Sequence, residues 1–185
     1  SMNLEDTDGD GDLDIHAIGF PAAYYLFENR GADGFAEISS ALDGIGRGLA
    51  IALADLDLDG AQDLIFGDRP YRNEVLVNHW LQVDLVGTQS NRDAIGARTT
   101  LVAGDLRSVR ELTGGAGPHQ EEGVLHFGLD IESFADSLII DWPSGARDVL
   151  VDLVVDRRIR VIEGTGEAFD VVPSRSIAAP PETLQ

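Results

Sequence analysis

The chain has 185 residues, of which 33 are acidic and 13 basic, all 13 arginine, so its formal net charge is −20. Such a charge repels nucleic acid and anionic membrane surfaces. No apolar run approaches the length of a membrane span, so we expect neither a nucleic-acid partner nor membrane insertion. Cysteine is absent, which excludes disulfides, thiol catalysis and thiolate metal sites.

Two aspartate-rich segments, residues 6–14 and 55–63, share one spacing. Each has Asp at positions 1, 3, 5 and 9 and Gly at position 6, where a sharp turn brings alternate carboxylates together. Dense oxygen ligands suit Ca²⁺, which takes about 6–8 oxygens. The expected ligands are the side chains of Asp6, Asp8, Asp10, Asp14, Asp55, Asp57, Asp59 and Asp63, with the backbone carbonyls of Asp12 and Ala61 at position 7. The sequence thus predicts two calcium sites.

These segments differ from EF-hand loops. An EF-hand has a bidentate Glu at position 12 and flanking helices, but position 12 is Ala17 in one segment and Phe66 in the other. The residues after each loop are short, β-prone runs. We therefore expect each site to close from position 9, at the start of a strand.

The pattern predicts an all-β chain. Up to residue 78 the expected strands lie near 13–19, 24–27, 35–38, 48–54, 64–66 and 71–73. The first loop is expected to lack most of its preceding strand, because only Asn3–Glu5 stand before Asp6. From residue 79 many short strands with Gly- and Pro-bearing turns predict a β-sandwich, with strands near 79–87, 97–103, 107–112, 124–127, 138–142, 149–155 and 158–162.

The first 78 residues resemble the FG-GAP (VCBS) repeat of integrin α-subunits. The resemblance rests on the two Asp loops, on the segments Phe27–Arg30 and Tyr71–Asn73, and on Asp33-Gly34-Phe35. It implies two β-propeller-type blades, residues 1–43 and 44–78, with calcium in each Asp loop. Two blades cannot close a propeller, so we expect a partial propeller: either it is attached to further blades in a longer protein, or the two blades pack on the domain that follows.

Residues 79–165 resemble the ASPIC/UnbV domain of the cartilage acidic protein family. The matching segments are His79–Leu81, Ser90–Ala97, His126–Leu129 and Trp142–Gly145. Together the resemblances imply a secreted, periplasmic or cell-surface protein. Residues 166–185, with their prolines and polar residues, are expected to form a flexible tail or linker.

Other polar groups carry weaker predictions. Asn91, Arg92 and Asp93 form either a partner-binding loop or a turn braced by an Arg92–Asp93 pair. His119 and His126 suggest a zinc site, but strand alternation sends such residues to different faces, and we expect hydrogen bonds to hold His126 instead. No Gly-x-Ser-x-Gly motif supplies a hydrolase nucleophile.

These observations favour a non-catalytic, calcium-stabilised extracellular module for interaction or adhesion, with a protein or glycan partner. Two alternatives stay open: a calcium-dependent, cyclase-like enzyme of a natural-product pathway, and a structural cap on a longer propeller. Buried polar residues around a cavity would favour the enzyme, and a flat or convex exposed patch would favour the module.

Overall fold

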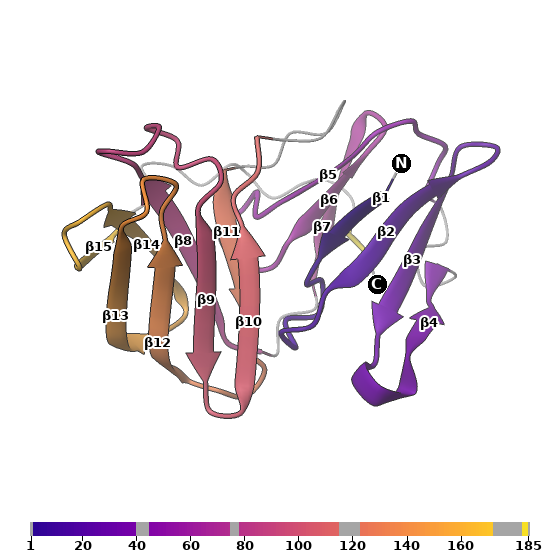
Figure 1. Cartoon of the computed structure of the whole chain (residues 1–185). Helices are drawn as coiled ribbons and strands as arrows, with labels where there is room; N and C mark the ends of the chain where they lie inside the picture. Colours follow the sequence, from indigo (N-terminus) through magenta and orange to yellow (C-terminus); the bar gives the residue numbers. More distant parts are fainter. Residues whose placement is uncertain (1, 40–44, 75–77, 115–122, 172–182, 185) are drawn as a thin grey trace.

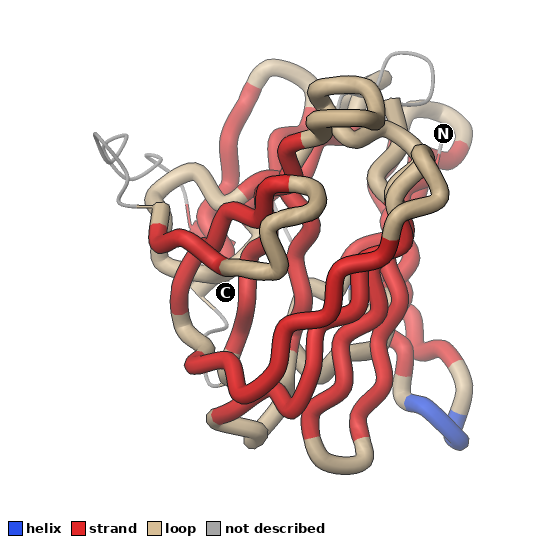
Figure 2. The backbone as a smooth tube through the Cα atoms, turned by 60° about the vertical axis from the view of Figure 1, so that its left-hand side comes forward, coloured by secondary structure: helices blue, strands red, loops and turns tan. Residues whose placement is uncertain are grey.

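The computed structural model describes residues 2–39, 45–74, 78–114, 123–171 and 183–184. The described chain is all-β, as the sequence predicts, and forms four four-stranded sheets. Figure 2 shows strands in red, with one short 3-10 helix, η1 (Gly31–Asp33), in blue. Figure 1 places two sheets in each half of the molecule.

The first sheet is an antiparallel meander built around the first Asp loop. Its strands are β1 (Met2–Glu5), β2 (Asp14–Gly19), β3 (Ala23–Asn29) and β4 (Phe35–Glu37), in the order β1-β2-β3-β4. β1 and β2 flank the loop and pair from Glu5↔Asp14 to Met2↔Ala17. The loop therefore occupies the turn of a β-hairpin.

The second sheet repeats this plan around the second loop. β5 (Ile51–Ala54) and β6 (Asp63–Phe66) pair from Ala54↔Asp63 to Ile51↔Phe66, which is the register of the first hairpin. β7 (Arg69–Asn73) follows as the third strand. Since β1 is as long as β5, the expectation that the first loop lacks most of its preceding strand is wrong. The four residues of β1 are too few to show an alternating pattern in the sequence, and it is their pairing with β2 that makes them a strand.

The third and fourth sheets stack as a sandwich, seen at the left of Figure 1. One has the order β10-β9-β12-β13 and the other the order β11-β8-β14-β15. The strands are β8 (Trp80–Val86), β9 (Arg98–Ala103), β10 (Leu106–Glu111), β11 (Val124–Gly128), β12 (Phe134–Asp141), β13 (Arg147–Val154), β14 (Arg157–Ile162) and β15 (Ala168–Asp170).

Each half has its own hydrophobic core. Both sandwich sheets contribute to one cluster, which contains the fully buried Val83, Leu101, Phe127, Leu138 and Ile159. A smaller cluster between the first two sheets contains Tyr24, Leu26, Ile51, Leu64, Phe66 and Tyr71. The alternation of apolar residues in the sequence generates both clusters, because successive strand residues face opposite sides of a sheet.

The expected flexible tail from residue 166 contains two short strands, so that prediction is wrong for them. β15 pairs with the edge of β14, and Ala168 packs against the sandwich core. β16 (Thr183–Leu184) pairs in parallel with β7 and gives the second sheet the order β16-β7-β6-β5. It takes the place beside β7 that β4 takes beside β3. An open sheet edge offers unpaired N–H and C=O groups, and two residues suffice to pair with it.

Candidate metal centre

The two Asp loops are fixed by the same internal hydrogen bonds. At position 1, Asp6 Oδ2 accepts the Gly11 N–H at 3.0 Å, and Asp55 Oδ2 accepts the Gly60 N–H at 3.0 Å. Both glycines have positive φ, 93° and 98°, a conformation that costs Gly little and other residues much. The Gly at position 6 therefore makes the turn that the sequence predicts.

Position 9 closes each loop through backbone contacts. Asp14 accepts N–H groups from Thr7 at 2.9 Å and Asn29 at 2.8 Å. Asp63 likewise accepts N–H groups from Leu56 at 3.0 Å and Asn73 at 2.8 Å. Position 9 thus ties each loop to the third strand of its own sheet.

Three carboxylates gather in each loop, with oxygens all within 4.8 Å of one another. The groups are Asp6, Asp8 and Asp10 in the first loop, and Asp55, Asp57 and Asp63 in the second. Among the predicted ligands, Asp14 and Asp59 stand outside these groups. The residues at position 7, whose carbonyls are predicted ligands, are held through their N–H groups. The Asp12 N–H donates to Asp10 at 2.8 Å, and the Ala61 N–H donates to Asp59 at 3.0 Å.

The donor set fits a hard cation. One oxygen in each loop, Oδ1 of Asp6 and Oδ1 of Asp57, is buried without a hydrogen-bond partner among the described residues. Burial, with the neighbouring carboxylates Asp10 and Asp8, raises the pKa of Asp6 to about 7, although Arg110 opposes the shift. Burial likewise raises the pKa of Asp55 to about 6. A partly buried, oxygen-only cluster with unused lone pairs is suited to Ca²⁺.

The loops differ in one charge. Arg72 Nε lies 2.7 Å from Asp57 Oδ2, and Arg72 Nη2 lies 2.8 Å from Asp59 Oδ2. Arg72 stands immediately before Asn73; in the first sheet the residue before Asn29 is Glu28, an acid. The second loop therefore has a close counter-charge from its own sheet, whereas the arginine near the first loop, Arg110, comes from the sandwich and lies 3.9 Å from Asp6.

The sandwich completes both loops from outside. Gly128 N, at the end of β11, donates to Asp6 Oδ2 at 3.0 Å, and Gln82 Nε2, on β8, donates to Asp55 Oδ2 at 2.7 Å. Each donor binds the aspartate at position 1 of one loop. Spacing along the chain gives no sign of either contact, since each depends on how the two halves pack.

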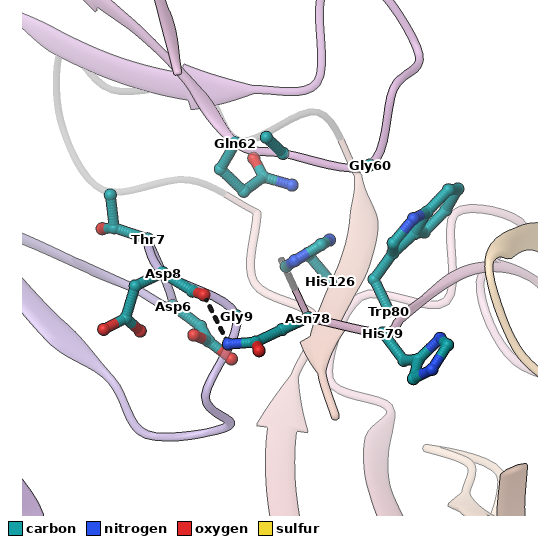
Figure 3. A pocket seen from close by; sticks show the side chains of 11 residues that line it. Asp6, Thr7, Asp8, Gly9, Gly60, Gln62, Asn78, His79, Trp80 and His126 are labelled. Atoms are coloured by element: carbon teal, nitrogen blue, oxygen red, sulfur yellow. Dashed lines mark hydrogen bonds between the residues drawn. The ribbon is translucent and has the colours of Figure 1, made fainter. Parts of the chain in front are cut away.

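The interface between the loops and the sandwich is close-packed. Asn78 Nδ2 donates to the Asp8 carbonyl at 2.9 Å, drawn as the dashed line in Figure 3, and the Asp130 N–H donates to the Gly9 carbonyl at 2.9 Å. Gly60 lies against the indole of Trp80, where any Cβ would collide. The cavity left between the loops measures about 10 Å³, room for about one water molecule. The two loops therefore lie at the interface between the two halves of the molecule.

Comparison with known families agrees with this division. Residues 6–66 match the family model of the FG-GAP-like repeat, and residues 87–168 match that of ASPIC and UnbV. The chain joins an FG-GAP-like repeat region to an ASPIC and UnbV domain. The resemblance inferred from the sequence is therefore confirmed, with the ASPIC and UnbV domain as the sandwich half. A search of curated proteins found no match. None of the described segments forms an apolar helix of membrane-spanning length.

The segment Asn91–Asp93 of the ASPIC and UnbV domain is exposed. Its brace is Asn91, whose side chain donates to the Ile95 carbonyl at 2.8 Å and accepts the Ile95 N–H at 2.9 Å. No Arg92–Asp93 pair is found among the described residues, so that alternative is wrong. A single amide closes the turn with both its groups, which leaves the charged side chains to solvent.

Two histidines of the sequence analysis have different outcomes. His119 lies outside the described residues. His126 is buried on β11, and its Nδ1 has no hydrogen-bond partner among the described residues, so the expectation that hydrogen bonds hold it is wrong for that nitrogen. Figure 3 shows His126 at the interface between the two halves, between the first loop and Trp80.

A further carboxylate, Glu163, which directly follows β14, was not predicted from the sequence. It accepts the backbone N–H groups of Thr88, Gln89 and Ser90, each at 2.7 Å, and the hydroxyls of Ser90 and Ser144. Burial works to raise its pKa, but the hydrogen bonds, first that of Ser144, prevail and lower it to about 2. Glu163 thereby fixes the loop that leads into Asn91–Asp93.

Proposed function

We propose that the chain is a calcium-stabilised, non-catalytic interaction module. Its Asp loops would bind one Ca²⁺ each and so hold the FG-GAP-like sheets against the ASPIC and UnbV sandwich. In the first loop Asp6, Asp8 and Asp10 would hold the ion, and in the second Asp55, Asp57 and Asp63. Bound Ca²⁺ supplies positive charge to carboxylates that otherwise repel one another.

One observation carries this proposal: the first aspartate of each loop is hydrogen-bonded to the sandwich. Gly128 donates to Asp6 and Gln82 donates to Asp55, so both carboxylate clusters lie at the same interface. A cation that orders these carboxylates also orders the acceptors of both interface hydrogen bonds. Calcium would therefore act on the relative placement of the two halves as well as on the loops.

Calorimetry and thermal unfolding in calcium and in EGTA test the proposal. We expect two binding events for Ca²⁺ and weaker binding of Mg²⁺, which demands a near-octahedral site. A site saturated at a hundredfold excess over Kd adds about 2.7 kcal/mol, which for a chain of this size raises the melting temperature by about 5–10 °C.

Matched variants locate the effect. Asp10→Ala should remove the calcium response of the first loop and Asp57→Asn that of the second. Asp105→Asn removes an exposed carboxylate from the β9–β10 turn and should leave both responses intact. Identical melting curves in EGTA and in millimolar calcium would show that the loops are acidic turns without a metal role.

The partner in this proposal is a protein or a glycan, and the location is extracellular, periplasmic or at the cell surface. Support comes from the FG-GAP-like match and from the exposed loop Asn91–Asp93, which Asn91 braces and which follows the residues that Glu163 anchors. A preformed loop loses little entropy on binding. Mutating Arg92 and Asp93 to Ala should abolish partner capture without changing the melting temperature.

One observation favours the enzyme alternative. A cavity of about 280 Å³ lies beside the first loop and is lined by the polar side chains of Arg110 and His126. Small-molecule sites are concave, with a few polar groups among apolar ones. Binding of a small molecule in this cavity would be the first test of the enzyme alternative.

A further inference from the structure

The two Asp loops lie close to each other as well as to the sandwich. The cavity of about 10 Å³ is lined by residues 6–9 of the first loop and by residues 60–62 of the second. Figure 3 shows Asp8 and Gly9 on one side of it and Gly60 and Gln62 on another. Because so little space separates the loops, a displacement of one changes the surroundings of the other.

Asn73, the last residue of β7, joins the two loops by hydrogen bonds. Its backbone N–H donates at 2.8 Å to Oδ1 of Asp63, which is position 9 of the second loop. Its side-chain Nδ2 donates, also at 2.8 Å, to the carbonyl of Thr7 in the first loop. Asn73 is only 3 % exposed, so water hardly competes for these bonds. One residue thus holds a carboxylate of one loop and the backbone of the other.

The equivalent residue of the first sheet, Asn29, directs the same groups into a single loop. Its backbone N–H donates to Asp14 Oδ1 at 2.8 Å, as that of Asn73 donates to Asp63. Its side-chain Nδ2 donates at 3.3 Å to the Leu13 carbonyl, which belongs to the same loop as Asp14. The two asparagines therefore differ in the destination of one amide group, and Asn29 is a natural control for Asn73.

The carbonyl that Asn73 binds lies inside the first carboxylate cluster. Thr7 stands between Asp6 and Asp8, two members of that cluster, and its own N–H donates to Asp14 Oδ2 at 2.9 Å. The Thr7 carbonyl belongs to the planar peptide unit that leads into Asp8. The bond from Asn73 therefore fixes the direction from which Asp8 enters the cluster.

Without a cation the carboxylates of each loop repel one another, so each loop can spread apart or stay gathered. Asn73 makes both of its bonds only when both loops are gathered. We propose that Asn73 is a positioning residue that couples the two candidate calcium sites, so that filling either loop favours filling of the other. An ion that orders Asp63 also orders Asn73 and, through it, Thr7, which lowers the ordering cost of the second binding step. This inference rests on the proposed function.

The charge of the ions acts in the opposite direction. A cation in one loop lowers the negative potential at the other and so weakens the second binding step. Salt reduces this effect, since the Debye length is about 8 Å at physiological ionic strength. Asparagine is uncharged, and Asn73→Ala leaves every charge of the two loops in place. Comparison of this variant with wild type therefore isolates the hydrogen-bonded link from the repulsion.

The test is a calcium titration of the ¹⁵N-labelled full chain. The amide signals of Gly11 and Gly60, whose N–H groups donate to position 1 of their own loops, report the Kd of each loop separately. The coupling factor is the Kd of the second loop in Asp10→Ala, which silences the first, divided by its Kd when the first loop is intact. Asn73→Ala should lower this factor about threefold to tenfold, the effect of one hydrogen bond. Asn29→Ala should leave it unchanged.

A second measurement keeps Asn73 in place and so covers a variant that does not fold. In Asp57→Asn, calcium fills only the first loop. The backbone amide signal of Asn73, which reports on Asp63 of the second loop, should nevertheless shift on calcium addition. The amide signal of Gly145, in the β12–β13 turn of the sandwich, serves as the control and should stay in place.

The outcomes separate this inference from the proposed function. If calcium shifts neither the Gly11 nor the Gly60 signal, or saturates only one loop, the proposed function fails and the inference fails with it. If both loops bind calcium, the inference alone is overturned by a coupling factor that is the same in Asn73→Ala and wild type, or that Asn29→Ala lowers equally. An Asn73 signal that does not move in Asp57→Asn would overturn it as well.

Discussion

At the scale of single residues, Arg72 makes the two loops unequal. Its guanidinium contacts Asp57 and Asp59 at 2.7 and 2.8 Å, so an entering cation must displace or share these carboxylates. The corresponding residue in the first sheet is Glu28, which adds negative charge near Asp8. Arg110 also acts on the first loop, but it lies farther from the carboxylates, 3.9 Å from Asp6, so the first loop should bind calcium more tightly than the second.

Removing this arginine should strengthen the second site. In a background of Asp8→Asn and Asp10→Asn, which silences the first loop, Arg72→Met should tighten calcium binding about tenfold at low salt, because one competing positive charge is gone. Calorimetry measures the change, and Arg107→Met, which removes an exposed arginine of β10, serves as the control. Unchanged affinity would mean that Arg72 swings away from the loop at no cost.

Gly128 is a second residue of note, because its contact with the first loop leaves no room for a side chain. A Cβ there would lie 2.6 Å from the Gly9 Cα and would also collide with Asp6 Oδ2. Gly128→Ala should destabilise the protein by about 1–3 kcal/mol, the range for overpacking, and weaken calcium binding at the first loop. Urea unfolding measures the loss. Gly46→Ala, with nothing within 4 Å of its Cβ and ordinary φ, should be close to neutral.

At the scale of elements, Glu163, which follows β14, anchors the loop of residues 88–90. Hydrogen bonds favour the charged carboxylate in the folded protein and lower its pKa from 4.5 to about 2. Since the folded pKa is the lower one, the stabilisation is present above about pH 4.5 and disappears as the pH falls towards 2.

Comparison with Glu163→Gln isolates this contribution. At neutral pH the variant should be less stable, because an amide presents one acceptor where the carboxylate receives five hydrogen bonds. The gap between wild type and variant should narrow as the pH falls from about 4.5 to about 3. Urea midpoints across this range give the gap, and a gap that stays constant would contradict the assignment.

At the scale of the whole molecule, the halves differ in what they need. The buried residues of the sandwich core all lie between Leu81 and Val155 or on β14, within one continuous segment. The FG-GAP-like half has a smaller core and depends on Gly128 and Gln82 of the sandwich to complete its loops. The sandwich should therefore fold alone without calcium, and the other half should fold alone only with it.

Fragments test this difference. Residues 78–171 should give a dispersed amide NMR spectrum in EGTA, and residues 2–74 should show such dispersion only when calcium is added. The first fragment includes β15, which pairs with β14. A collapsed spectrum of the first fragment in EGTA would show that the sandwich relies on the loops.

The sequence alone was sufficient for the features that depend on short separations. Alternating apolar residues placed most strands, and the Asp spacing with Gly11 and Gly60 located both loops and the clusters within them. A hairpin turn sets its own hydrogen bonds, so a local pattern of nine residues contains the information. Both family matches follow from such local patterns.

Tertiary structure decided what joins these parts. Gly128 reaches Asp6 across 122 residues, and β16 pairs with β7 from the far end of the chain. The cavity of about 280 Å³ exists because strands of both halves surround it. Arg72 belongs to a family motif in the sequence, and only its folded position shows that it pairs with Asp57 and Asp59 of the second loop. Such contacts depend on how sheets pack, and packing is set by the summed burial of many side chains, which no single spacing along the chain records.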